Sequence, residues 1–164
     1  RQKKTALELA DYSKAIELNP NLTLAFYYRG EIYFEQDKYA LALKDLNVVI
    51  QQDPKNFMAH IRRGISFQAL NQTRNAISDY STAISIDPAS WIGYFNRGAI
   101  LMKGGEYIAA IDDLTNSILL NPKHAESYSY RSYCYCKIGE NSLSLKDFRL
   151  ALELGALAAL QCSK

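Results

Sequence analysis

The chain of 164 residues has few of the features that mark several large classes of protein. Its three cysteines are an odd number without framework spacing, which fits a reducing, cytoplasmic compartment better than secretion. The net charge is only +2, with no basic block beyond the first four residues, so we expect no nucleic-acid partner. No apolar run approaches the roughly 18 residues that a membrane helix needs, so we expect no membrane partner either.

Groups that could perform catalysis or bind a metal are also scarce. The two histidines, His60 and His124, are isolated, and His60 falls in a packing position, which predicts a core histidine with its polar atoms satisfied. Cys134 and Cys136 lie two residues apart on a predicted helix and would point to different faces, which argues against a metal pair. No phosphate loop, dinucleotide fingerprint or nucleophile elbow is present. We therefore expect no enzymatic activity, no cofactor and no metal.

The few prolines are spaced with complete regularity. Each of the four follows an asparagine or aspartate, and each is 34 residues from the next: Pro20, Pro54, Pro88 and Pro122. A second series of turn-forming residues lies midway, again 34 apart: Asp37, Asn71, Gly105 and Gly139. These types tolerate the left-handed backbone that ends a helix. Between the two series, apolar residues recur at helical spacing. Each unit is therefore predicted to be helix, tight turn, helix and proline turn.

This pattern predicts the boundaries of the elements. The first helices are expected over 23–36, 57–70, 91–104 and 125–138, and the second helices over 39–52, 73–86, 107–120 and 141–154, after a half unit over 4–18. The chain is thus predicted to be one array: a partial repeat (1–20), four repeats (23–54, 57–88, 91–122 and 125–156) and the start of a capping or further helix (157–164). Because the chain opens on Arg1, we interpret it as part of a longer protein.

The unit resembles the tetratricopeptide repeat (TPR), which has the same period. The small residue of that family's first helix matches Gly30, Gly64, Gly98 and Ser132, and the small residue of its second helix matches Ala42, Ala76, Ala110 and Ser144. The aromatic position that follows holds Tyr12, Leu46, Tyr80, Leu114 and Phe148. The resemblance extends over essentially the whole chain, and it implies an all-α, right-handed superhelix of antiparallel helix pairs.

Two charged positions depart from the usual family pattern. Arginine precedes the small residue in each first helix, at Arg29, Arg63, Arg97 and Arg131, and the second helices have Asp11, Asp45, Asp79, Asp113 and Asp147. We hypothesise that each aspartate pairs with the arginine of the following unit, as Asp11–Arg29, Asp45–Arg63, Asp79–Arg97 and Asp113–Arg131. Asp147 would then lack a partner. The alternative is that both positions lie on solvated faces and contribute little.

The resemblance also implies where a partner would bind. In this family the first helices line a concave, peptide-binding face, and the matching positions here are Tyr27, Glu31, Phe34, Met58, Ile61, Ile65, Ile92, Phe95, Met102 and Tyr133. Their apolar centre predicts an apolar or amphipathic protein segment as partner. The alternative is that these side chains only pack against neighbouring first helices.

The resemblance favours a non-catalytic scaffold or adaptor for protein–protein interaction. Some relatives bind acidic chaperone tails through a lysine, asparagine and arginine clamp, but the matching positions hold Tyr27, Glu31, Arg62, Ile92 and Asn96, which disfavours that partner. A second hypothesis is a structural subunit built into a large assembly, such as a cytoskeletal or ciliary one. A third is a regulatory region of an enzyme whose catalytic domain lies outside this chain.

Overall fold

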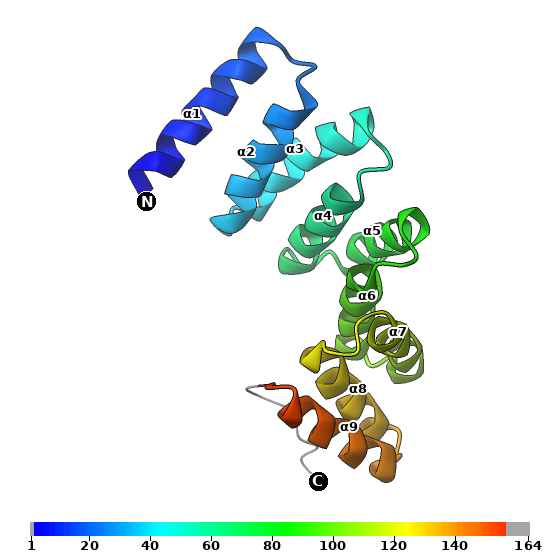
Figure 1. Ribbon diagram of the computed structural model, residues 1–164. Coiled ribbons are helices and arrows are strands. Elements are labelled where there is room, and N and C mark those ends of the chain that lie inside the picture. The colour runs from blue at the N-terminus through cyan, green and yellow to red at the C-terminus, as the bar shows by residue number, and fades with distance from the viewer. Residues whose placement is uncertain (1, 157–164) are drawn as a thin grey trace. The chain divides into compact units, whose positions relative to one another are not determined.

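The computed structural model describes residues 2–156, and every regular element in this range is an α-helix (Figure 1). The helices are α1 (Gln2–Leu18), α2 (Thr23–Glu35), α3 (Tyr39–Gln52), α4 (Phe57–Ala69), α5 (Thr73–Ile86), α6 (Trp91–Lys103), α7 (Tyr107–Leu120), α8 (Ala125–Lys137) and α9 (Asn141–Glu153). They divide into two compact units, with α1–α5 in unit 1, up to Ile86, and α6–α9 in unit 2, from Asp87 onward. The predicted all-α class is confirmed, and each predicted helix is present with ends shifted by no more than two residues.

The midway turns have the left-handed backbone that their residue types predict. The φ angle is 57° at Asp37, 59° at Asn71, 83° at Gly105 and 85° at Gly139. In the first turn the amide of Lys38 donates to the carbonyl of Tyr33 over 2.9 Å, and the amide of Asp37 donates to Phe34 over 3.0 Å. This pair of hydrogen bonds satisfies carbonyls that the end of α2 would otherwise leave without a donor. The same pattern recurs 34 residues further along at each step.

The side chain of the residue before each proline accepts a hydrogen bond within the turn. The side-chain oxygen of Asn19 accepts a hydrogen bond from the amide of Asn21 over 3.0 Å, and Asp53 accepts from Lys55 over 3.2 Å. Asp87 and Asn121 make the same bond two residues ahead. Asparagine and aspartate are suited to this local turn, and proline fixes its own φ angle within it. These turns therefore start each new helix pair at the predicted interval.

The core of each unit forms where a small residue of a first helix meets a large residue of a second helix. In unit 1, Gly64 lies against the ring of Tyr80, which is fully buried, and a Cβ at Gly64 would come 2.5 Å from Tyr80 Cε1. In unit 2, Gly98 lies against Leu114 in the same way, at 2.9 Å from Cγ. The close approach of the helices therefore depends on the absence of a side chain at these glycines.

The arginine–aspartate hypothesis is right about the pairing but wrong about the partner. Each arginine binds the aspartate 16 residues later, in its own repeat, with two parallel hydrogen bonds of 2.7–2.9 Å: Arg29–Asp45, Arg63–Asp79, Arg97–Asp113 and Arg131–Asp147. Asp147 therefore has a partner, contrary to the expectation. This pairing is favoured because the arginine and aspartate flank the glycine contact at which the two helices of one repeat touch.

Arg29, Arg63 and Arg131 also reach the preceding second helix, but at a different residue. The Nη1 atom of Arg29 donates to Ser13 over 3.1 Å, that of Arg63 to Asn47 over 2.9 Å, and that of Arg131 to Thr115 over 3.0 Å. Each acceptor lies two residues after the aspartate that we had predicted as the partner of that arginine. The guanidinium thus fastens three consecutive helices.

His60 is buried, with Nδ1 3.0 Å from Asp79 Oδ1 and Nε2 3.0 Å from the carbonyl oxygen of Pro54, so it is the satisfied core histidine that we predicted. The repeat boundaries and the single array stay predictions, since the two units are described separately. The predicted helix start over 157–164 lies outside the described residues.

Candidate functional site

In unit 1 the candidate site lies on the first helices α2 and α4, which contact each other as well as α3. Five of the predicted groove residues on these helices are partly exposed: Tyr27, Glu31, Phe34, Met58 and Ile65. They form a mixed surface, and its aromatic rings and methionine are residue types that protein interfaces favour at their centres, whereas glutamate is not.

The centre of this surface is a contact among Glu31, Arg62 and Phe34. The Nε atom of Arg62 donates to Glu31 Oε2 over 3.1 Å, joining α4 to α2. The guanidinium carbon of Arg62 also lies 4.8 Å from the centre of the Phe34 ring, a favourable cation–π distance. Sequence reasoning placed Arg62 only among the chaperone-clamp positions, and its opposite charge to Glu31 was the available signal for this contact.

One oxygen of Glu31 has no hydrogen-bond donor. Arg62 Nε lies 3.0 Å from Oε1 but bonds only with Oε2, so Oε1 is buried and unsatisfied. Burial raises the pKa of the Glu31 carboxyl, and the positive charge of Arg62 opposes this only in part. Burial, and next the charge of Glu31, also raises the pKa of Tyr27. A carboxylate in this state is stabilised by any further donor brought to it.

Two of the predicted groove residues belong to the interior instead. Ile61 is 2% exposed and Met102 is 7% exposed, and Met102 is part of the core cluster of unit 2 with Ala110, Leu114 and Cys134. These two side chains therefore offer almost no surface to a partner. The alternative stated for the groove, packing within the fold, holds for them.

In unit 2 the predicted residues lie beside an aromatic cluster. Phe95 stacks on Tyr130 at 5.4 Å between ring centres, and His124 contacts both Trp91 at 4.2 Å and Phe95 at 4.5 Å. The sequence analysis selected Phe95 but not Trp91 or His124, because these two lie at or before the start of their helices. Ile92 and Tyr133 are also partly exposed, and the Nζ atom of Lys137 lies 5.1 Å from the Tyr133 ring.

The residues at the chaperone-clamp positions bind each other or the backbone. Arg62 is engaged by Glu31, and the side-chain amide of Asn96 donates to the carbonyl of Ile92 over 2.8 Å. Glu31 repels a terminal carboxylate rather than attracting it, because both are negatively charged. That an acidic chaperone tail is a poor partner stays a prediction.

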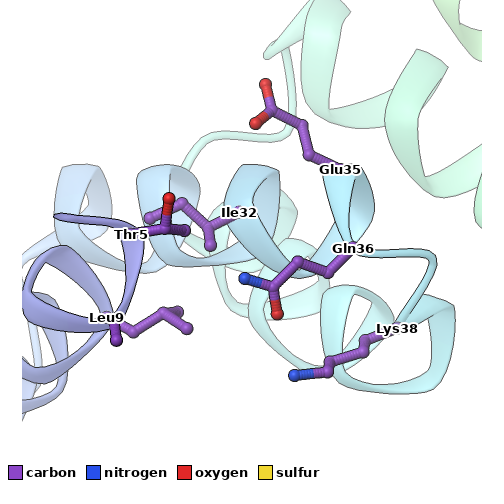
Figure 2. A pocket seen from close by; sticks show the side chains of 7 residues that line it. Thr5, Leu9, Ile32, Glu35, Gln36 and Lys38 are labelled. Carbon is purple, nitrogen blue, oxygen red and sulfur yellow. The ribbon is translucent and has the colours of Figure 1, made fainter. Parts of the chain in front are cut away.

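A hollow outside the predicted groove lies between α1 and α2 in unit 1 (Figure 2). Its volume is about 570 Å3, and it is lined by Thr5, Ala6, Leu9, Ile32, Glu35, Gln36 and Lys38. Sequence reasoning missed it because its walls come from the half unit and from the turn after α2.

Two kinds of feature are absent from the part of the chain that the structure describes. Among these residues, no three histidine, cysteine, aspartate or glutamate side chains gather as metal ligands would. No helix in the same range is both long enough and apolar enough to cross a membrane.

Two family models match the chain, and both describe the tetratricopeptide repeat. They cover residues 24–56 and 61–119, together more than half of the sequence. No curated protein sequence matches the chain.

Solved structures with the same fold are numerous. A crystal structure of MamA is 21% identical over 89% of this chain and 85% of its own, with a TM-score of 0.86. A MamA from Desulfovibrio magneticus is 17% identical over 94% of this chain and 87% of its own, also with a TM-score of 0.86. YrrB, described as a TPR protein with an unusual peptide-binding site, is 20% identical over 93% of this chain and 79% of its own, with a TM-score of 0.82.

Proposed function

Because the chain belongs to the tetratricopeptide repeat family, we propose that it is a non-catalytic scaffold that holds a segment of another protein against its first helices. The observation that carries this proposal is the surface of Tyr27, Glu31, Phe34 and Arg62 in unit 1, which combines partly exposed rings with an unsatisfied carboxylate oxygen. YrrB has a peptide-binding site in its own description, and its likeness in fold adds weight to a peptide ligand here.

The apolar part of the surface sets the first requirement on the partner. Tyr27, Phe34, Met58 and Ile65 are partly exposed on neighbouring helices, so a bound segment would remove apolar area from water. Aromatic rings and methionine adapt well to irregular partners. The partner is therefore an apolar or amphipathic segment.

Glu31 sets the second requirement. Its Oε1 atom is buried without a donor, and its charged form is disfavoured by burial. A lysine or an arginine of the partner beside the partly exposed Glu31 side chain would offset that cost through its positive charge. We infer that the bound segment places a basic side chain next to its apolar residues.

The experiment is selection of short random peptides on the immobilised protein. The affinity of each selected peptide is then measured with a synthetic copy. We expect peptides that combine apolar residues with lysine or arginine. Phe34→Ala and Ile65→Glu should each weaken binding by about tenfold or more, the equivalent of roughly 1.4 kcal/mol. Glu31→Gln should weaken only the peptides that have a basic residue.

A matched control is Ser78→Glu, which places the same charge at an exposed position of the second helix α5. It should leave the affinity unchanged. Peptides that bind Ile65→Glu and Phe34→Ala as tightly as the unaltered protein, with both variants folded, would refute the site.

A second candidate function is a structural subunit built into a larger assembly through its second helices. The observation in its favour is the exposure of apolar side chains on α7, where Ile108 is 71% and Leu119 is 72% exposed. An assembly of this kind would be weakened by Ile108→Lys and Leu119→Lys but not by Ile65→Glu. This difference separates it from the peptide-binding proposal.

A further inference from the structure

A group of aromatic rings lies on the first helices of unit 2, α6 and α8, which contact each other. Phe95 is at its centre: its ring stacks on Tyr130 at 5.4 Å between ring centres, and Trp91 tilts against it at 6.1 Å. Tyr133 follows Tyr130 by three residues on α8, so the two lie on one side of that helix. These four side chains are all partly exposed, and we call them the aromatic surface.

The polar atoms of the aromatic surface are free to bind a ligand. In the described part of the chain, the indole N–H of Trp91 and the hydroxyls of Tyr130 and Tyr133 make no hydrogen bond. Glu31 Oε1 is the one buried side-chain polar atom without a partner among these residues, so the three groups reach solvent. An indole N–H can only donate, and a phenol donates readily. The surface therefore offers donors to a ligand that has unused acceptors.

The rings are held in place from behind by His124. Its Nδ1 atom lies 2.8 Å from the Ser127 hydroxyl, which lies 2.8 Å from that of Ser117, and both serines are fully buried. The ring of His124 contacts Trp91 at 4.2 Å and Phe95 at 4.5 Å. The aromatic surface is thus ordered before a ligand arrives. Little conformational entropy remains to be lost there, and the total cost is lowest when the ligand is rigid as well.

The charges of the aromatic surface differ from those of the proposed site in unit 1. Ala99 and Tyr130 stand where the repeat two places earlier has Glu31 and Arg62, so no ion pair lies at the centre. Two charged side chains contact the rings of unit 2, one of each sign. Glu126 Oε2 is 3.4 Å from His124 Nε2, and Lys137 Nζ is 5.1 Å from the centre of the Tyr133 ring. This balance selects an uncharged ligand rather than an acidic or a basic one.

We propose that the aromatic surface binds a proline-rich segment of another protein in the polyproline II conformation. The proline rings lie on the exposed faces of Trp91, Phe95 and Tyr130, as apolar groups do on aromatic grooves. A polyproline II helix is rigid and has no internal hydrogen bonds, so its carbonyls accept from the indole N–H and the two hydroxyls. An α-helix would use most of its carbonyls internally. This interaction goes beyond the proposed function, because it uses no residue of the site in unit 1.

The test measures the fluorescence anisotropy of labelled decaproline, which forms a polyproline II helix in water, with the whole chain. A labelled glycine–serine peptide of equal length is flexible and serves as the comparison. We expect saturable binding of decaproline alone. Trp91→Phe and Tyr130→Phe each remove a donor but keep a ring, so both variants should fold, and circular dichroism checks this. Each should weaken binding about threefold or more, and the two together about tenfold or more.

Tyr128→Phe is the matched control, because it removes a hydroxyl from α8 outside the aromatic surface, where the Tyr128 ring lies beside Arg131. It should leave binding unchanged. Phe34→Ala should also leave it unchanged, and its effect on the selected peptides reports on the proposed function separately. Decaproline that does not saturate at millimolar concentration, or that binds no more tightly than the glycine–serine peptide, would overturn the inference. Full binding by the folded Trp91→Phe, Tyr130→Phe double variant would overturn it as well.

Discussion

Arg63 holds the carboxylate of Asp79 through two parallel hydrogen bonds, Nη2–Oδ1 at 2.7 Å and Nε–Oδ2 at 2.8 Å. Burial alone would raise the pKa of Asp79, but the bonds from Arg63 and His60 outweigh it and hold the pKa below the ordinary value of 3.8. The carboxylate is therefore charged at neutral pH although its side chain is only 4% exposed. Such a pair fixes the geometry of two helices through its direction as well as its strength.

The simplest pair for a mutational test is Arg29–Asp45, which has no histidine beside it. Arg29→Met should destabilise the protein by about 3–5 kcal/mol, because it leaves Asp45 charged and buried without a counterion. Adding Asp45→Leu should restore most of that loss, since the stranded charge is then removed. Urea unfolding of the two single variants and the double variant measures the coupling. If the double variant is no more stable than Arg29→Met, the pair does not act as we describe.

The glycine contacts differ in tightness from repeat to repeat. A Cβ at Gly64 would lie 2.5 Å from the buried Tyr80 ring, whereas one at Gly30 would lie 3.3 Å from Asp45 Cβ. Gly64→Ala should therefore destabilise unit 1 by roughly 1–3 kcal/mol through overpacking. Gly30→Ala should stay within about 1 kcal/mol of the unaltered protein, because the gain in helix propensity offsets the milder contact. Equal losses for the two variants in thermal unfolding would contradict this account.

The turn at Asn71 provides a test of backbone strain. Its φ of 59° lies in the left-handed region, which asparagine tolerates and alanine does not. Asn71→Ala should lower the free energy of unfolding by about 1 kcal/mol, whereas Asn71→Gly should leave it unchanged or slightly higher. Chemical unfolding of both variants distinguishes strain from loss of the side chain, because both variants lack the amide.

The aromatic cluster of unit 2 should respond to acid through His124. Burial lowers the pKa of His124 below the ordinary value of 6.5, and Glu126 offsets this only in part. The unfolded chain then takes up the proton first as the pH falls. Stability from this site is thus complete above about pH 6.5 and is lost as the pH falls towards the folded-state pKa.

Two measurements check this prediction. Unfolding by urea at about pH 7.5 and about pH 5.5 should show a smaller loss of stability in His124→Phe than in the unaltered protein. Fluorescence reports on the same step, because Trp91 is the only tryptophan and its ring centre is 4.2 Å from that of His124. The same pH dependence in His124→Phe would assign the effect to other groups.

The helices were predictable because their ends have chemical markers. Proline turns and left-handed positions such as Asn71 stop a helix wherever they occur, so the period alone sets most boundaries. The choice of aspartate for each arginine was not predictable in this way. In a strict repeat, Asp45 is as regular a neighbour of Arg63 as of Arg29, and only the packing of the two helices in one repeat decides between them.

The depth of the groove residues was also beyond the sequence. Ile61 and Ile65 both lie on α4, one turn apart, yet Ile61 is buried and Ile65 is partly exposed. An apolar stripe at helical spacing does not predict what fraction of each side chain a neighbouring helix covers. Likewise, the free oxygen of Glu31 arises from the angle at which Arg62 approaches, which no residue pattern encodes.

Because each arginine pairs with the aspartate of its own repeat, the pairing bears on how the number of repeats can change. Since every full repeat neutralises its own buried aspartate, deleting or duplicating 34 residues strands none of these aspartates in the interior. Had the bond crossed between repeats, the first arginine and the last aspartate of an array would lack a partner at its two ends. Tandem recombination can therefore add or remove copies without stranding one of these aspartates.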